Sequence, residues 1–319
     1  MRAKLLPFVA AGAATLTLIW SRAQRVHKGV VVSLIRYAKL RWRLARAERI
    51  IVITDFDRTV TTHACGISCH GVLEGCSELG AEYRAATLAL KQKYLPVETS
   101  PDLTIEEKLP MMQDWYRESH TLLAGEPLTA EVLDRAARAS AVVLRPGFIT
   151  LLLTLERLGV PLVVCSAGLG NVVRSLLAAK LPPLASAAVE RLPIVSNWLR
   201  FGGADGHVIG FSEPLLHMYN KDGAFLRAAL GEKWPTLGAG RTVALVLGDG
   251  LGDATMADGL GMDHVVRIGY LNEAEGPRLE AHLPQYRKRF DAVVLHDGSF
   301  EFVTGLLRAE RERPRARRM

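Results

Sequence analysis

The fold is decided by the stretch IIVITDFDRT at residues 50–59. Its first five residues form a continuous apolar run, which is typical of a strand buried on both faces. Four further short runs share this character, at residues 162–165, 243–247, 265–268 and 292–295. Helical patterns separate the runs, such as 148–158, which Gly159 ends as a C-cap. This alternation predicts an α/β fold, doubly wound around a parallel sheet.

A long interruption follows the first predicted strand. More than a hundred residues without a clear strand separate it from the second one. Thr104 and Glu107 form a capping box there, in which each side chain satisfies an unpaired backbone donor near the other. We therefore expect a helical cap at about residues 65–140. Farther on, the segments 194–201 and 207–211 flank Gly-Gly-Ala-Asp-Gly, which is a hairpin signal.

Composition and charge exclude several classes of protein. The 319 residues are 49% hydrophobic and 23% charged, with four Cys, which excludes a disordered chain, a multi-span membrane protein and a disulfide scaffold. The net charge of +7 belongs to the two ends. Residues 1–46 contain ten Lys or Arg and no acid, whereas residues 47–307 contain 24 Lys or Arg and 31 Asp or Glu. An acidic central domain gives no reason to expect a nucleic-acid partner.

The N-terminal segment has an uncharged run of 16 residues, 5–20, between basic residues. This pattern favours a signal anchor, hence a transmembrane segment and attachment to a membrane through residues 5–20, although about 20 residues are needed for a full span. A targeting peptide for an organelle fits as well, because residues 30–44 are a helical pattern rich in Arg. The third alternative is an N-terminal extension with neither role.

These patterns give an expected division of the chain. Residues 1–46 form a basic N-terminal anchor or targeting segment, residues 47–307 form the main domain, and residues 308–319 form a basic disordered tail. The expected localisation is therefore membrane-anchored or organelle-targeted.

Polar side chains follow the predicted strands. Asp55 and Asp57 come directly after the first strand, and ligands of open α/β sheets bind beyond the carboxyl ends of strands. Two carboxylates this close repel each other unless a cation or a proton lies between them. Ser166 and Ala167 follow the second strand in a turn of small residues, which can hold an anionic group on its backbone N–H groups.

Two more segments complete the constellation. Lys221 lies at a predicted helix start and supplies a point charge for a phosphate. Asp249 and Asp253 follow the third strand in the sequence Gly-Asp-Gly-Leu-Gly-Asp. Hard oxygen ligands without His favour Mg²⁺ over zinc.

In chain order, these four segments resemble the motifs of the haloacid dehalogenase-like (HAD-like) hydrolase superfamily. Further segments between residues 48 and 307 resemble the cytosolic 5'-nucleotidase III, or pyrimidine 5'-nucleotidase, family. They are residues 93–98, 103–108, 115–116, 119–120, 164–168, 195–197, 217–221, 248–259 and 268–272. The resemblance implies a HAD-like core with a helical cap inserted after its first strand.

The resemblance also implies roles for the motif residues. Asp55 would attack the phosphorus and form an aspartyl phosphate, while Asp57 would protonate the leaving oxygen and then activate water. Mg²⁺ would be held by the Asp55 side chain, the Asp57 backbone carbonyl and Asp249, and Asp253 would orient these ligands.

The remaining roles concern the substrate. Ser166, the Ala167 backbone N–H and Lys221 would hold the phosphoryl oxygens. Glu98 in the cap would contact the base, and Ser119 matches a second position near the base. These roles predict an enzyme that hydrolyses pyrimidine nucleoside 5'-monophosphates, such as UMP and CMP, to nucleoside and phosphate.

Several alternatives stay open. Family members carry a longer segment with a base-stacking aromatic residue near His63, so the substrate could instead be 7-methyl-GMP or a phosphomonoester that is not a nucleotide. A membrane-tethered protein that binds nucleotides without hydrolysing them is the alternative of another class. Trp115 and Tyr116 either pack the cap or touch ligand. The thiols at 65, 69 and 76 and His70 fit a closed zinc site poorly.

Overall fold

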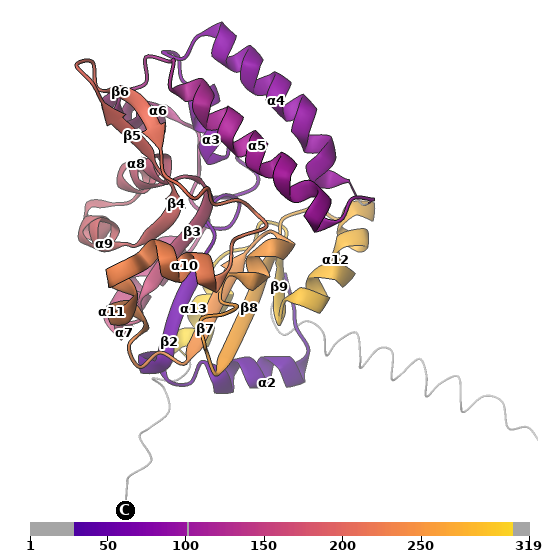
Figure 1. Cartoon of the computed structure of the whole chain (residues 1–319). Coiled ribbons are helices and arrows are strands. Elements are labelled where there is room, and N and C mark those ends of the chain that lie inside the picture. The colour runs from indigo at the N-terminus through magenta and orange to yellow at the C-terminus, as the bar shows by residue number, and fades with distance from the viewer. Residues whose placement is uncertain (1–28, 101, 309–319) are drawn as a thin grey trace, which may run out of the picture.

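The computed structural model describes residues 29–100 and 102–308 (Figure 1). Its centre is a seven-stranded sheet in the order β1-β9-β8-β7-β2-β3-β4, in which every neighbouring pair is parallel except β1 and β9. The strands are β1 (Val30–Val31), β2 (Ile50–Thr54), β3 (Leu162–Leu169), β4 (Ile194–Asn197), β7 (Val243–Gly248), β8 (His264–Leu271) and β9 (Ala292–Leu295). All five predicted strands are confirmed, and the expected α/β class with them.

Helices cover both faces of this sheet. Alternate residues of β2 point to opposite sides, so Ile50 and Val52 join one apolar core and Ile51 and Ile53 join another. Each fully buried Ile of this kind stabilises the fold by about 1.5–3 kcal/mol. The first core contains residues of α7 (Phe148–Leu158), α8 (Gly170–Lys180) and α13 (Glu301–Arg308). The opposite face is covered by α10 (Gly223–Leu230), α11 (Trp234–Gly238) and α12 (Pro277–Arg289).

The helical insertion between β2 and β3 contains α3 (Cys69–Glu74), α4 (Ala81–Thr99), α5 (Ile105–Leu123) and α6 (Ala130–Ala139). The paired helices α4 and α5 stand above the sheet, whereas α6 packs against α8 of the core (Figure 1). The capping box at the start of α5 is confirmed: Thr104 Oγ1 accepts the Glu107 N–H at 3.2 Å, and Glu107 accepts the Thr104 N–H at 2.8 Å. The predicted hairpin is present as β5 (Leu199–Gly202) and β6 (His207–Phe211), and β6 contacts α5. Its first arm is shorter than predicted, because residues 194–197 form β4 of the central sheet.

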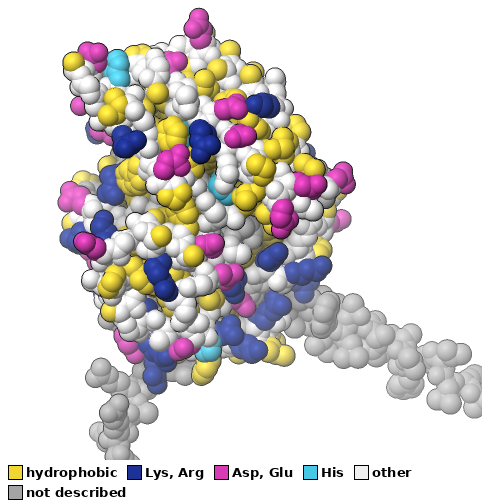
Figure 2. All heavy atoms as spheres, in the orientation of Figure 1, with side chains coloured by type: hydrophobic (Ala, Val, Ile, Leu, Met, Phe, Trp, Pro, Cys, Tyr) yellow, Lys and Arg dark blue, Asp and Glu magenta, His cyan; other side chains and the backbone are white. Residues whose placement is uncertain are grey.

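The folded core begins earlier than the sequence predicts. β1 pairs with β9, and α2 (Leu34–Arg43) buries Leu40 beside the core residue Leu44. The main domain was predicted to begin at residue 47, but the apolar side chains of β1 and α2 before that position are buried in the core. On the face that Figure 2 shows, Lys and Arg gather over α2 and α12, while charges of both signs mix elsewhere. Short elements complete the chain: η1 (Ala47–Arg49), η2 (Pro183–Ala185), α9 (Ser186–Arg191), η3 (Gly231–Lys233) and η4 (Leu251–Thr255).

The transmembrane prediction needs correction. Within residues 29–100 and 102–308, no helix is both long and apolar enough to cross a membrane. The run 5–20 on which the prediction rested lies outside the described residues, as does the tail from 309 onward. That run has 16 residues, fewer than the roughly 20 that a span requires, so its apolar character was weak evidence from the start. Attachment to a membrane is accordingly withdrawn.

Candidate active site

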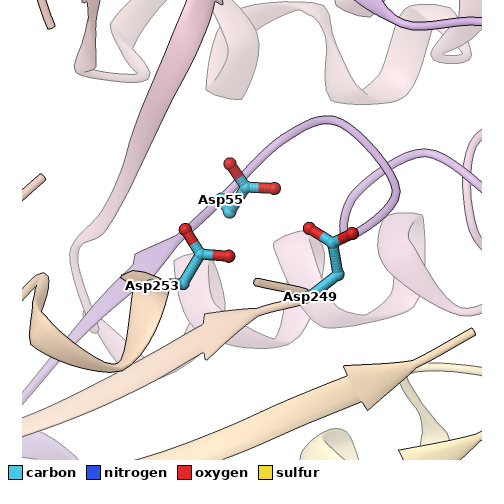
Figure 3. Close-up of side chains that lie close together, drawn as sticks. All are labelled: Asp55, Asp249 and Asp253. Atoms are coloured by element: carbon cyan, nitrogen blue, oxygen red, sulfur yellow. The ribbon is translucent and has the colours of Figure 1, made fainter. Parts of the chain in front are cut away.

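Three carboxylates meet beyond the carboxyl edge of the sheet. Asp55 follows β2, Asp249 follows β7, and Asp253 lies on η4. One oxygen from each of the three lies within 4.8 Å of the other two, and the side chains crowd around one space (Figure 3). The parallel pairing of β2 with β7 explains this meeting, because it brings the ends of both strands to the same edge.

A glycine at the end of β7 lets Asp253 into this space. A Cβ atom on Gly248 would lie only 2.2 Å from the Cβ of Asp253. Both Asp253 oxygens are occupied: Oδ2 accepts the Gly250 N–H at 2.8 Å, and Oδ1 accepts a hydrogen bond from Lys221 at 2.7 Å. Asp253 is thereby held in one orientation beside Asp55.

Lys221 is the cation inside this cluster. Only 4% of its side chain is exposed, and it forms ion pairs with both Asp55 and Asp253. Burial alone would lower the pKa of Lys221, but Asp253 and Asp55 raise it well above its usual value. The two carboxylates therefore favour the charged form of the Lys221 ammonium group.

One lysine does not balance three carboxylates. Burial raises the pKa of Asp55 to about 7, helped by Asp253 and opposed by Lys221. Burial and the charges of Asp55 and Asp253 raise the pKa of Asp249 well above its usual value. Among the described residues, the buried Oδ2 of Asp55 has no hydrogen-bond partner. Close carboxylates with an unpaired oxygen are the donor set that a hard divalent cation fits.

Asp57 and Ser166 lie next to this cluster. The Cys69 N–H, at the start of α3, donates to Asp57 Oδ1 at 2.9 Å. Burial nevertheless raises the pKa of Asp57 above that of an ordinary aspartate. Ser166 is buried within β3, and its Oγ accepts the Gly168 N–H at 3.1 Å. A Cβ on Gly168 would lie 3.0 Å from the Cβ of Cys69, so this glycine lets α3 approach β3.

The cap contributes a second group of residues. Glu98 lies half-buried in the last turn of α4, and Ser119 lies half-buried on α5. Burial raises the pKa of Tyr116, and the charge of Glu98 raises it further. The ring of Tyr116, on α5 of the cap, lies 6.4 Å from that of His217 in the core. Trp115 instead stacks on Tyr94 at 5.8 Å within the cap. Trp115 therefore packs within the cap, whereas Tyr116 lies between the cap and the core.

Three histidines pack around Tyr116. The His70 ring stacks on that of the fully buried His120 at 5.8 Å, and Tyr116 contacts both rings edge-on. His217, from the core, contacts Tyr116 at 6.4 Å. Burial lowers the pKa of His70 to about 4 and that of His120 to about 3, so both are neutral at pH 7. His63, by contrast, is exposed, and its N–H donates to Asp297 at 2.9 Å.

The sequence analysis missed Arg145. Its side chain is fully buried, and it donates to the carbonyls of Thr59 at 2.6 Å, Gly298 at 2.9 Å and Arg58. It also pairs with Asp297 at 3.0 Å. Asp297 in turn accepts the N–H groups of residues 63 and 64, so this ion pair fixes the whole loop after Asp57. The sequence carries one weak signal for it, a lone Arg between an apolar stretch and Pro-Gly.

Comparison with known proteins agrees with this geometry. The profile of the family described as pyrimidine 5'-nucleotidase (UMPH-1) matches residues 55–310. The chain belongs to the pyrimidine 5'-nucleotidase family. A 7-methylguanosine phosphate-specific 5'-nucleotidase of Homo sapiens is 32% identical over 270 residues, which cover 83% of this chain and 86% of that protein. The crystal structure of cytosolic 5'-nucleotidase IIIB bound to cytidine is 29% identical, has a TM-score of 0.77 and covers 90% of this chain and 96% of its own.

Membership in the pyrimidine 5'-nucleotidase family settles the reaction class. The HAD-like fold is confirmed, and the protein is a phosphoric monoester hydrolase that acts on nucleoside 5'-monophosphates. The acidic cluster fits the metal dependence of HAD-like nucleotidases.

The relatives also correct the expected localisation. A Caenorhabditis elegans relative, 32% identical over 264 residues that cover 79% of this chain and 66% of that protein, is named a cytosolic 5'-nucleotidase 3. The solved structure carries the same word in its name. The prediction of a membrane-anchored or organelle-targeted protein is therefore wrong. It rested on the charge and apolar pattern of the first 46 residues, which carries no information about the catalytic domain.

Proposed function

We propose that this enzyme hydrolyses nucleoside 5'-monophosphates with Mg²⁺ through an aspartyl phosphate on Asp55. The observation that carries the proposal is the buried Lys221 between Asp55 and Asp253, with Asp249 completing the cluster. This arrangement pairs a nucleophilic carboxylate with a fixed positive charge for the phosphoryl oxygens.

The chemistry needs two displacements at phosphorus. In the first, an Asp55 oxygen attacks the phosphorus, the bond from phosphorus to the ribose O5' breaks, and Asp57 gives its proton to that oxygen. In the second, Asp57 takes a proton from a water molecule, whose oxygen attacks the phosphorus and releases Asp55. The raised pKa of Asp57 supports the first step, because a carboxyl group that keeps its proton nearer to neutral pH can act as an acid there.

Other residues would hold the phosphate and the metal. Ser166, the Ala167 N–H and Lys221 would bind phosphoryl oxygens, and the buried position of Ser166 and Lys221 supports this. The Asp55 side chain, the Asp57 carbonyl and Asp249 would hold Mg²⁺, while Asp253, whose oxygens are already occupied, would orient Lys221. When bound, Mg²⁺ would offset the negative charge of the phosphate and so allow an anionic carboxylate to approach.

Glu98 and Ser119 would read the base, since both lie in the cap helices that face the catalytic edge. A pyrimidine such as that of UMP or CMP is our first expectation, in line with the family description. A second candidate is 7-methyl-GMP, because relatives in several animals are named for that substrate. We also retain a division into a phosphatase domain with a cap at about 65–140, to which β1 and α2 are now added.

The test is phosphate release by the full chain from UMP, CMP, AMP, GMP and 7-methyl-GMP with Mg²⁺, beside an Asp55→Asn control. We expect release from a subset of bases, its loss in the control and its loss in EDTA, with recovery when Mg²⁺ is restored. A folded wild-type protein that releases phosphate from none of them would contradict the proposal. Substantial turnover by Asp55→Asn would contradict the covalent mechanism alone.

A further inference from the structure

The first helix of the cap begins beside the catalytic edge. Ser68 precedes α3, and its Oγ accepts the Gly71 N–H at 3.3 Å, which makes Cys69 the first helical residue. The N–H of a first helical residue has no carbonyl acceptor within its own helix. The Cys69 N–H instead donates to Asp57 Oδ1 at 2.9 Å. The start of the cap therefore holds the carboxyl group to which we assign the acid role.

Cys69 is held in place from both sides. Its side chain is fully buried, and an added Cβ on Gly168 would lie 3.0 Å from its Cβ and 3.2 Å from its Sγ. On the cap side, α3 contacts α4 and α6, and the ring of His70 stacks on that of His120 in α5 at 5.8 Å. The N–H of Cys69 is thereby fixed relative to both the core strand β3 and the cap.

This hydrogen bond decides how Asp57 can carry a proton. A neutral carboxyl group has one oxygen that bears the proton and a carbonyl oxygen that is the better acceptor. Because Oδ1 accepts the Cys69 N–H, the proton belongs on Oδ2. The same bond becomes stronger when Asp57 loses that proton, since hydrogen bonds to an ionised acceptor are about twice as strong as neutral ones. The Cys69 N–H therefore orients the acid and also favours the release of its proton.

We infer that Cys69 is a positioning residue, whose backbone N–H makes Asp57 Oδ2 the oxygen that donates the proton to the leaving group. The inference rests on the proposed function. As an Asp55 oxygen forms its bond to phosphorus, the bond from phosphorus to the ribose O5' breaks, and the Oδ2 proton passes to that O5'. Asp57 is left as a carboxylate, to which the Cys69 N–H still donates. Because α3 belongs to the cap, the position of the cap is linked in this way to the acid of the core.

The backbone donor can be removed by substitution with proline. Pro is favoured at the first position of a helix, and Ser68 already has the extended conformation (φ −94°, ψ 174°) that a residue before Pro requires. Cys69→Pro therefore deletes the N–H with little expected damage to α3, and Cys69→Ala deletes the thiol but keeps the N–H. Ala130→Pro is the matched control, since this exposed residue is the first of α6 and also follows an extended residue.

The experiment compares kcat/KM for p-nitrophenyl phosphate with that for the nucleotide that the wild type hydrolyses fastest. This quantity includes only the steps up to the departure of the leaving group. p-Nitrophenolate leaves without a proton, whereas the ribose oxygen needs one. Cys69→Pro should therefore lower the ratio of the nucleotide value to the p-nitrophenyl phosphate value about tenfold, and Asp57→Asn should lower it further. Cys69→Ala should keep the wild-type ratio, and Ala130→Pro should keep both wild-type values.

An unchanged ratio in Cys69→Pro, or the same fall of the ratio in Cys69→Ala, would overturn the inference. If circular dichroism shows that the proline variant does not fold, Ser68→Ala takes its place. It removes the hydroxyl that holds the Gly71 N–H at the start of α3, so it should lower the ratio about threefold. An unchanged ratio there would overturn the inference as well. A wild type inactive on every nucleotide, or an unchanged ratio in Asp57→Asn, would instead overturn the proposed function, so the two failures are distinguishable.

Discussion

The two ends of the candidate site are built differently. The core end, made of Asp55, Lys221, Asp249 and Asp253, is buried or nearly so, and most of its charges are held by ion pairs or hydrogen bonds. The cap end, made of Glu98, Ser119 and Tyr116 on α4 and α5, is only partly buried.

This difference assigns a separate task to each end. Charges in a buried, fixed arrangement need no reorganisation during the reaction, which suits the chemistry that all substrates share. A half-exposed group is weakly constrained, so substitutions there can change which base binds at little cost to folding. We therefore expect substitutions at the core end to abolish activity and those at the cap end to redistribute it.

The largest effect is expected from Lys221→Met. It leaves Asp55 and Asp253 facing each other without a buried cation, so kcat/KM should fall about 1000-fold. The free energy of unfolding should fall by about 3 kcal/mol. Phosphate release and urea unfolding measure both quantities, with the exposed Lys233→Met as the matched control. A variant no worse than this control would show that the buried ion pairs are dispensable.

The second-largest effect is expected from Arg145→Met. This substitution removes the donor to several backbone carbonyls and the ion-pair partner of Asp297. We expect a loss of about 3 kcal/mol in stability. We also expect kcat to fall about tenfold with little change in KM, since the loop that carries Asp57 loses its fixed position. The exposed Arg157→Met should cost under about 0.5 kcal/mol. Equal losses in the two variants would argue against this role.

Glu98→Gln tests the cap end directly. It should change the ranking of CMP, UMP and 7-methyl-GMP by about fivefold, because a lost charge–base contact is worth about 1 kcal/mol. Hydrolysis of p-nitrophenyl phosphate, which has no base, should stay within twofold. The exposed Glu106→Gln serves as the control. A uniform fall for every substrate would show that Glu98 does not read the base.

The last effect concerns the pH dependence of stability and leaves the site chemistry untouched. Burial lowers the pKa of His120 to about 3, well below that of an exposed His. Between that value and about pH 6.5, the unfolded chain therefore binds a proton at His120 that the folded protein does not bind. Stability should therefore fall as pH drops below about 6.5, by up to about 1.4 kcal/mol per pH unit for this group. His120→Phe should lose less Tm between pH 7.5 and 5.5 than the wild type, whereas the exposed His63→Phe should match it. Identical pH dependence in His120→Phe would refute the assignment.

Much of the core end could be predicted from the sequence. A continuous apolar run such as Ile50–Thr54 predicts a buried strand. A parallel sheet then brings the residues that follow its strands to one edge. Asp55 and Asp249 follow strands that a local pattern identifies, so their meeting could be predicted without knowledge of side-chain packing. The short strand β1 could not be predicted, because two valines are too few to form a recognisable pattern. Its position in the sheet depends on pairing with β9.

The predicted strands and the order of the motifs could be derived from the sequence alone, since both depend on local runs and on spacing along the chain. The reaction class followed from the resemblance of those motifs to a known family. Tertiary structure alone decided which distant groups meet. The hydrogen bonds of Arg145 to the loop after Asp57 span more than 80 residues, and those of Arg145 and Asn272 meet at one carbonyl. Such contacts follow from packing between segments, which no local pattern encodes.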